Sequence, residues 1–217
     1  MKAYFVAAAA LAMSAPALAA EHPTAGSHID VYYSNLDVEV DVEGLGEDSV
    51  DGDGGGLRLW IGNNIGLFTV DVQANKLDGN VEGIELDGDC DVVRVGVGGR
   101  FINRPDAGLW LRAEYVRAQI DGSASFGGDD LGSASDKQEG FGIHAGGLIG
   151  HGMFKGYAEI GRLELEDLDG MEYTVGLNVQ PGMIGGFVEY RYTDLELDDF
   201  DIDETYSDIR LGVRVGF

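Results

Sequence analysis

From residue 28 onward the chain repeats one pattern, in which apolar residues alternate with polar or small residues over short segments bounded by turn residues. The segment 172–180 has the sequence EYTVGLNVQ, and the segment 206–217 has the sequence YSDIRLGVRVGF. A period of two places successive side chains on opposite faces of a β-strand. The pattern therefore predicts an all-β protein whose strands have two chemically different faces.

Ten segments show this pattern clearly enough to be predicted as strands. They are residues 28–38, 55–62, 65–76, 92–102, 108–120, 139–150, 154–165, 172–180, 184–196 and 206–217.

The predicted connections alternate in length along the chain. Short turns are expected at 63–64, 103–107, 151–153 and 181–183, and longer, irregular loops at 39–54, 77–91, 121–138, 166–171 and 197–205. Short turns at one end and long loops at the other are typical of transmembrane β-barrels, whose strand number is even in bacterial single-chain examples. We therefore predict an up-and-down antiparallel transmembrane β-barrel of about ten strands, with eight as the alternative.

The first twenty residues differ from the rest. Lys2 is followed by an apolar stretch and then by the sequence ALAA at 17–20, which is typical of a cleavable signal peptide. We expect a signal peptide at 1–20 and the barrel at 21–217. No later apolar run reaches the roughly eighteen residues that a spanning helix needs. Cys90 is the only cysteine, so no internal disulfide forms, and we expect a free thiol on the surface or in a loop.

On these features the chain resembles the small bacterial outer-membrane barrels of the OmpA, OmpX and opacity-protein kind. The resemblance rests on the signal peptide, the alternation, and a last strand, Tyr206 to Phe217, that ends on an aromatic residue. It implies Sec export, periplasmic chaperones, insertion into the outer membrane with Phe217 as part of the insertion signal, and a monomer among lipid and lipopolysaccharide. The best-known members have eight strands. A soluble sandwich or lipocalin-like barrel would also alternate, but with its apolar face inward.

If the apolar positions face lipid, the alternate positions face the lumen, and many of these are charged. Acids are expected on the rising strands and cations on the descending strands, within cross-strand reach of one another. Because an unpaired buried charge is costly, we expect a narrow lumen crossed by ion pairs, with a gated path for small ions as the alternative. The predicted lumen charge network consists of Asp71, Glu114, Glu159, Glu189, Arg58, Arg94, Arg100, Arg210, Arg214 and His144.

The formal net charge is −25, and the acids concentrate in the predicted long loops, including Glu172 in the fourth. We expect chiefly a solvated acidic surface, which excludes nucleic acid as a partner. No tightly bound cofactor is expected. Loosely bound Ca²⁺ or Mg²⁺, bridging to lipopolysaccharide, is the alternative, because clustered carboxylates suit these ions. The candidate metal ligands are Asp51, Asp53, Asp87, Asp89 and Asp91, which lack the full calcium-loop pattern.

An enzymatic role is not predicted. Nucleophilic catalysis needs a Ser or Cys beside a base, and the four histidines lie near the N-terminus, in a short turn, or in mid-strand at His144, where no inward Ser is expected at the same depth. We therefore expect a non-enzymatic role in envelope structure, surface interaction or limited cation-preferring permeation. The alternative is an outer-membrane hydrolase, a protease or lipid-modifying enzyme, with a rim carboxylate site.

Overall fold

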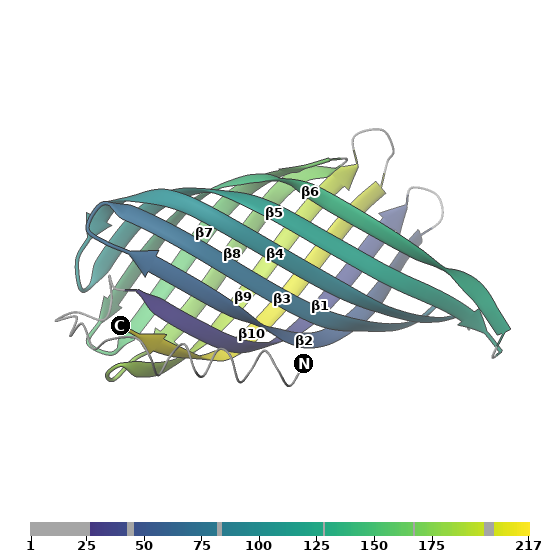
Figure 1. Cartoon of the computed structure of the whole chain (residues 1–217), viewed down its shortest axis with the longest axis horizontal. Coiled ribbons are helices and arrows are strands. Elements are labelled where there is room, and N and C mark those ends of the chain that lie inside the picture. Colours follow the sequence, from purple (N-terminus) through teal and green to yellow (C-terminus); the bar gives the residue numbers. More distant parts are fainter. Residues whose placement is uncertain (1–26, 43–45, 82–83, 128, 167, 198–201) are drawn as a thin grey trace.

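All ten predicted strands are present in the computed structural model, and they close into one antiparallel barrel (Figure 1). The structure describes residues 27–42, 46–81, 84–127, 129–166, 168–197 and 202–217; the predicted signal peptide at 1–20 lies outside these ranges. The strands are β1 (His28–Val42), β2 (Gly46–Gly62), β3 (Gly66–Val81), β4 (Ile84–Asn103), β5 (Ala107–Phe126), β6 (Asp129–His151), β7 (Phe154–Leu165), β8 (Leu168–Val179), β9 (Ile184–Leu197) and β10 (Ile202–Gly216).

Each strand pairs with its neighbours in sequence, and β1 pairs with β10 to close the barrel. The closing register runs without a break from His28 opposite Gly216 to Val42 opposite Ile202. Closure leaves no strand edge whose backbone groups would lack hydrogen-bond partners in lipid. Within the described part of the chain, no helix has the length and apolar character needed to cross a membrane.

Four strand connections were predicted to be short, and this is confirmed. Asn63 forms the first of these turns: its Oδ1 accepts hydrogen bonds from the backbone N–H groups of Ile65 and Gly66, at 2.9 and 2.7 Å. Gly152, between β6 and β7, has a φ of 60°, a left-handed conformation that glycine adopts without steric cost. The turns therefore use residues that favour tight chain reversal.

The prediction of long irregular loops at the other end is wrong for most of their length. The strands continue well beyond the predicted ends: β4 begins at Ile84 rather than at 92, and β5 and β6 together cover residues 107–126 and 129–151. In Figure 1 the hairpin of β5 and β6, coloured teal to green, reaches farthest from the short turns. The sequence of 84–91, IELDGDCD, does alternate, but its acids were interpreted as a loop.

The outer face of the lower barrel, near the short turns, is apolar. Large side chains are exposed there on every side, for example Val97 (61%), Leu177 (62%) and Leu211 (63%). On β10 the outward apolar residues run from Ile209 to Val215, and with the terminal Phe217 the stretch is nine residues long, the lower end of the 9–11 that cross a membrane. The stretch ends in a belt of exposed or half-buried aromatic residues: Tyr33, Tyr115, Phe141, Tyr173, Tyr190 and Tyr192. This arrangement is that of a membrane-spanning β-barrel.

Above this belt the two faces of the sheet exchange character. On β4, the outward residues are Val93, Val95 and Val97 below the belt but Asp87, Asp89 and Asp91 above it. The inward residues change in the opposite sense, from Arg94 below to Val92, Cys90 and Leu86 above. The adjacent pair Val92 and Val93 marks the crossover. The upper barrel is therefore apolar inside and acidic outside, as expected for a barrel that stands in water.

This assignment of lipid-facing and water-facing levels predicts opposite effects of one substitution on a single strand. Leu111→Arg, in the apolar stretch of β5, should lower the free energy of unfolding in vesicles by about 2–4 kcal/mol, because arginine is costly near the bilayer midplane. Gln119→Arg, outward on the same strand but above the belt, should change it by less than about 0.5 kcal/mol. Equal effects in urea titrations would contradict the assignment.

Candidate functional site

A continuous group of charged side chains fills the lumen of the lower barrel; we call it the septum. Its members are joined by contacts of 4 Å or less, and all have side chains no more than 11% exposed. The septum consists of Asp30, Asp71, Glu114, Glu159, Glu172, Glu189, Asp208, Arg58, Arg94, Arg112, Arg191, Arg210, Arg214 and His144. Their strand neighbours, such as Ala113 and Tyr115 beside Glu114, point outward in the apolar stretch and the aromatic belt, so the septum lies at the level of the membrane.

Glu189 is the most heavily bonded carboxylate of the septum. Arg58 donates to both of its oxygens, at 2.8 and 2.6 Å, and Tyr157 and Arg210 donate to it at 2.6 and 3.2 Å. Glu189 is on β9 and Arg58 on β2, which are not neighbours in the barrel. This two-pronged ion pair therefore crosses the bore, and bidentate pairs of this kind are among the strongest charged hydrogen bonds.

A second connection crosses the lumen between β4 and β8. Arg94 lies 3.0 Å from Glu114 on the adjacent strand and 2.6 Å from Glu172 on the far side. Arg112 continues the chain, since it contacts Glu114 and pairs with Glu159 at 2.5 Å. Because every carboxylate faces at least one guanidinium group, the septum avoids the cost of isolated buried charges, several kcal/mol each.

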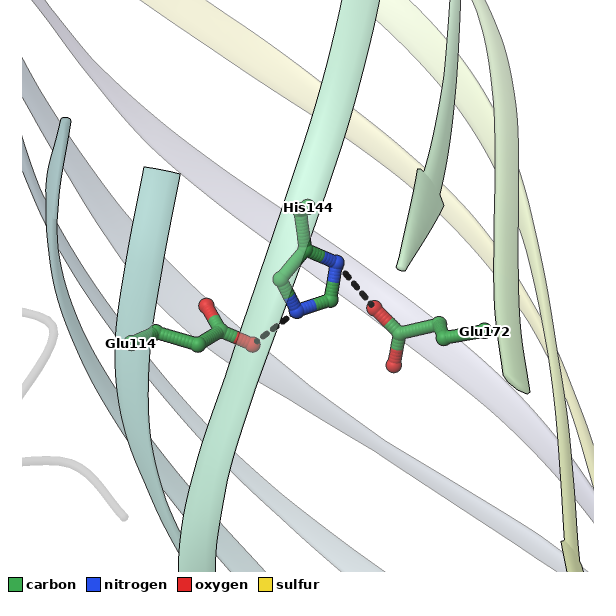
Figure 2. A group of neighbouring side chains, drawn as sticks. All are labelled: Glu114, His144 and Glu172. Carbon is green, nitrogen blue, oxygen red and sulfur yellow. Dashed lines mark ion pairs between the residues drawn. The ribbon is translucent and has the colours of Figure 1, made fainter. Parts of the chain in front are cut away.

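His144 lies between two carboxylates, as Figure 2 shows. Its Nε2 is 3.0 Å from Glu114 and its Nδ1 is 3.8 Å from Glu172, on opposite sides of the ring. Neither ring nitrogen has a hydrogen-bond partner in the described part of the chain, and each lies within 4 Å of a carboxylate oxygen. The septum contains seven carboxylates and six guanidinium groups, and His144 lies among three of the carboxylates.

The same three residues, Glu114, His144 and Glu172, are close enough together to be considered as metal ligands. Two observations favour ion pairing instead. The carboxylates face different ring nitrogens, so one ion bound to either nitrogen has only one of them in front of it (Figure 2). Both carboxylates also contact Arg94, whose positive charge disfavours a cation beside it.

The structure brings nine of the ten residues of the predicted lumen network into the septum. Arg100 lies apart, at the end of β4 near the short turns, where its Nη1 donates to the backbone carbonyl of Asn63 at 3.3 Å. The register of β4 with β5 shifts just after Arg100, and this residue lies at the end of the barrel that carries the short turns. The sequence interpretation missed Asp30, Arg112, Glu172, Arg191 and Asp208.

The missed residues show that the predicted division of charges between strands is not strict. Arg112 and Arg191 are on rising strands that also carry septum acids, two residues from Glu114 and Glu189 respectively. Glu172 was assigned to an acidic loop, but it lies on β8 and is 1% exposed. A spacing of two residues from a predicted inward charge was the signal that could have identified Arg112 and Arg191.

Two cavities of different character flank the septum. The lower one, toward the short turns, has a volume of about 110 Å³ and polar walls that include Arg58 and Glu159. The upper one, which we call the outer chamber, has a volume of about 720 Å³ and lies above the septum residues Arg94, Arg191 and Arg210. Buried apolar clusters form its walls: Leu36, Val38, Leu77 and Cys90 on one part of the circumference, and Val116, Leu163, Leu168 and Leu195 on another.

Cys90 was predicted to be a surface or loop thiol, and this is wrong. Its side chain points into the outer chamber from β4 and is 4% exposed. Burial, with smaller contributions from Asp91 and Asp208, raises the pKa of the Cys90 thiol to about 11. The outward neighbours Asp89 and Asp91 misled the interpretation, because they made the segment resemble an acidic loop.

The five candidate metal ligands all lie on the outer wall above the belt. Asp51 and Asp53 on β2, and Asp87, Asp89 and Asp91 on β4, are exposed and point away from the lumen. The register places Asp37, Asp51, Asp78 and Asp87 directly opposite one another across β1 to β4. Partial burial and the adjacent Asp51 raise the pKa of Asp37 above its usual value. Phe217 lies at the opposite end, where its backbone N–H donates to Ser27 at 2.9 Å.

A closed barrel with an apolar outer surface and a charged lumen defines an integral β-barrel protein of the bacterial outer membrane. Comparison with known families agrees. The chain belongs to the family of the outer membrane protein β-barrel domain, whose model matches residues 5–180. No curated protein matches the chain.

Several solved structures are similar in fold. The attachment invasion locus protein Ail of Yersinia pestis is 16% identical, with a TM-score of 0.43 over 87% of this chain and 99% of Ail. Neisserial surface protein A is 14% identical, with a TM-score of 0.40 over 87% and 97%. The porin NanC is 12% identical, with a TM-score of 0.45 over 87% and 100%. These likenesses are too distant to bear on function.

The packing around His144 predicts a steric requirement for glycine at position 161. Gly161 pairs directly with His144, and a Cβ there would overlap the imidazole ring, including its Cγ. Gly161→Ala should therefore lower the free energy of unfolding by about 1–3 kcal/mol. Gly156→Ala on the same strand is the control, because its Cβ would lie 3.6 Å from Leu177 in ordinary contact. Urea titration of both variants tests this; equal stability would contradict the packing described.

Proposed function

We propose that this protein is a closed, non-enzymatic barrel of the outer membrane that presents an acidic surface to the exterior and does not form an open pore. The observation that carries the proposal is the septum. Its ion pairs join β2 to β9 and β4 to β8 across the lumen, and the cavity beneath it measures only about 110 Å³. Open aqueous channels are typical of much larger barrels, of about sixteen strands.

The contacts of the reactive side chains favour the non-enzymatic reading over an outer-membrane hydrolase. His144 contacts carboxylates, at 3.0 to 3.8 Å. Ser34 is an inward, buried serine, but its Oγ donates to Asp208 at 2.6 Å and accepts from Gln73 at 2.9 Å. Activation of a serine needs a base within hydrogen-bond reach that can take its proton. Asp208 already accepts from Arg210 at 2.6 Å.

If the septum seals the lumen, the protein should conduct no ions in planar bilayers, and one substitution in the septum should allow conduction. In planar bilayers the unchanged protein should give no resolved current steps. Glu159→Ala should produce measurable steps and lower the unfolding midpoint, because it leaves Arg112 and the Trp110 ring N–H without a shared acceptor. Glu164→Ala, which removes an outward acid of the same strand, is the control and should remain silent. Steps of similar size from all three proteins would refute the sealed lumen.

The acidic outer wall supports a second part of the proposal, in which divalent cations associate with the surface and link it to lipopolysaccharide. Like charges directly opposite on adjacent strands repel one another, and Ca²⁺ or Mg²⁺ would relieve the repulsion among Asp37, Asp51, Asp78 and Asp87. Calorimetry should detect binding at millimolar Ca²⁺, weakened by Asp51→Asn and Asp78→Asn together. The control pair Asp194→Asn and Glu139→Gln should have a smaller effect, because Asp194 lies opposite Met171 and Thr205 and Glu139 lies opposite Arg117. If calorimetry detects no heat of binding at millimolar Ca²⁺, this part of the proposal is refuted.

A further inference from the structure

The outer chamber has an apolar lining. Neither the closure of the barrel nor its acidic outer surface requires such a lining. The lower lumen is filled by charged and hydrogen-bonded side chains, and side chains of the same kind could also fill the lumen above the belt. Instead the walls there are built from buried Leu, Val and Ile side chains around a cavity of about 720 Å³. Contiguous apolar surface without a protein partner is typical of a binding site, and the volume lies within the usual range of small-molecule pockets, about 300–1,000 Å³.

The chamber has a closed floor and a mouth that faces water. Its floor is the septum, represented by Arg94, Arg191 and Arg210. Its upper lining includes Leu131 and Ala124, near the far end of the β5–β6 hairpin and above the aromatic belt. A ligand therefore enters from the exterior rather than from the bilayer, and it stops at the septum.

The charges at the two ends of the chamber restrict the head group of such a ligand. Asp136 and Glu204 line the cavity in its upper part, and the outer wall around it is acidic. The arginines of the floor are already paired, as with Asp208 and Arg210 at 2.6 Å. An anionic head group would be repelled by the acids at the mouth, whereas a neutral or cationic head group would be accommodated among them.

We propose that the outer chamber is a binding site for a single-chain amphiphile with an uncharged or cationic head group, which inserts its hydrocarbon chain toward the septum and leaves its head group at the acidic mouth. The proposal does not depend on whether the septum conducts. Each buried methylene contributes about a fourfold gain in affinity. A chain shorter by two methylenes should therefore bind about 15-fold more weakly.

Cys90, the single cysteine, provides a reporter inside the chamber. The mature chain in nanodiscs of zwitterionic phospholipid would be alkylated with N-ethylmaleimide at pH 9, where a thiol with a pKa of about 11 reacts at a measurable rate. Saturating dodecyltrimethylammonium should slow the reaction at least tenfold. Decyltrimethylammonium should need about 15-fold more free ligand for half protection, and dodecanoate at least tenfold more than the dodecyl cation.

A matched pair of substitutions separates binding in the chamber from partition into lipid. Ala118→Phe fills the chamber, while Ala113→Phe places the same ring on the lipid-facing side of the same strand. Equilibrium dialysis should find one dodecyltrimethylammonium per chain, above empty nanodiscs, for the unchanged protein and for Ala113→Phe, and none for Ala118→Phe. Ala124→Phe, also in the lining, serves the same purpose if Ala118→Phe does not fold.

Three results would overturn the proposal. The first is an alkylation rate that none of the amphiphiles changes. The second is equal ligand binding by the chamber-filling and lipid-facing variants. The third is a folded protein whose Cys90 does not react at all while the unfolded chain reacts fully, because the chamber would then be closed to the exterior. Tighter protection by dodecanoate than by the dodecyl cation would refute the assignment of the head group.

Discussion

The solvent outside each strand changes along its length, and the rest of the structure follows from this constraint. Below the aromatic belt the outer face meets lipid, so it must be apolar, and the lumen receives the polar side chains. Above the belt the outer face meets water, and the apolar residues move inside. Because inward and outward positions alternate, a strand makes the change by shifting its apolar residues by one position, as β4 does at Val92 and Val93.

The septum and the outer chamber are the two consequences of that shift inside the barrel. At membrane level, inward charges cannot reach bulk water, so Glu189, Arg58 and their neighbours must satisfy one another across the bore. Above that level the inward side chains are mostly apolar, and they surround a cavity of about 720 Å³. The barrel is thus filled where its wall faces lipid and hollow where its wall faces water.

The strand number, the short turns and most of the septum could be predicted from the sequence, because each depends on a local signal. Alternation over 172–180 identifies a strand whatever its surroundings, and Asn63 marks a turn by its own side chain. The extended hairpins could not be recognised as easily, since acids such as Asp87 and Asp89 are as typical of loops as of a strand standing in water. Glu172 and Cys90 were misplaced for the same reason. The contacts across the lumen, such as Arg94 with Glu172, depend on barrel closure and have no local signal.

The pairing of β1 with β10, which we call the seam, closes the barrel and has a consequence for how the protein folds. Asp30 and Arg214, 184 residues apart in sequence, form a bidentate ion pair at 2.7 Å across it. Ser34 also donates a hydrogen bond to Asp208 across the seam, at 2.6 Å. Contacts of such sequence separation are entropically expensive and form late. The nine hairpins between consecutive strands can assemble as a growing sheet, but the septum is complete only when the last strand meets the first. An open sheet would leave part of the septum unpaired, so pairing of β1 with β10 and pairing of the septum charges stabilise each other.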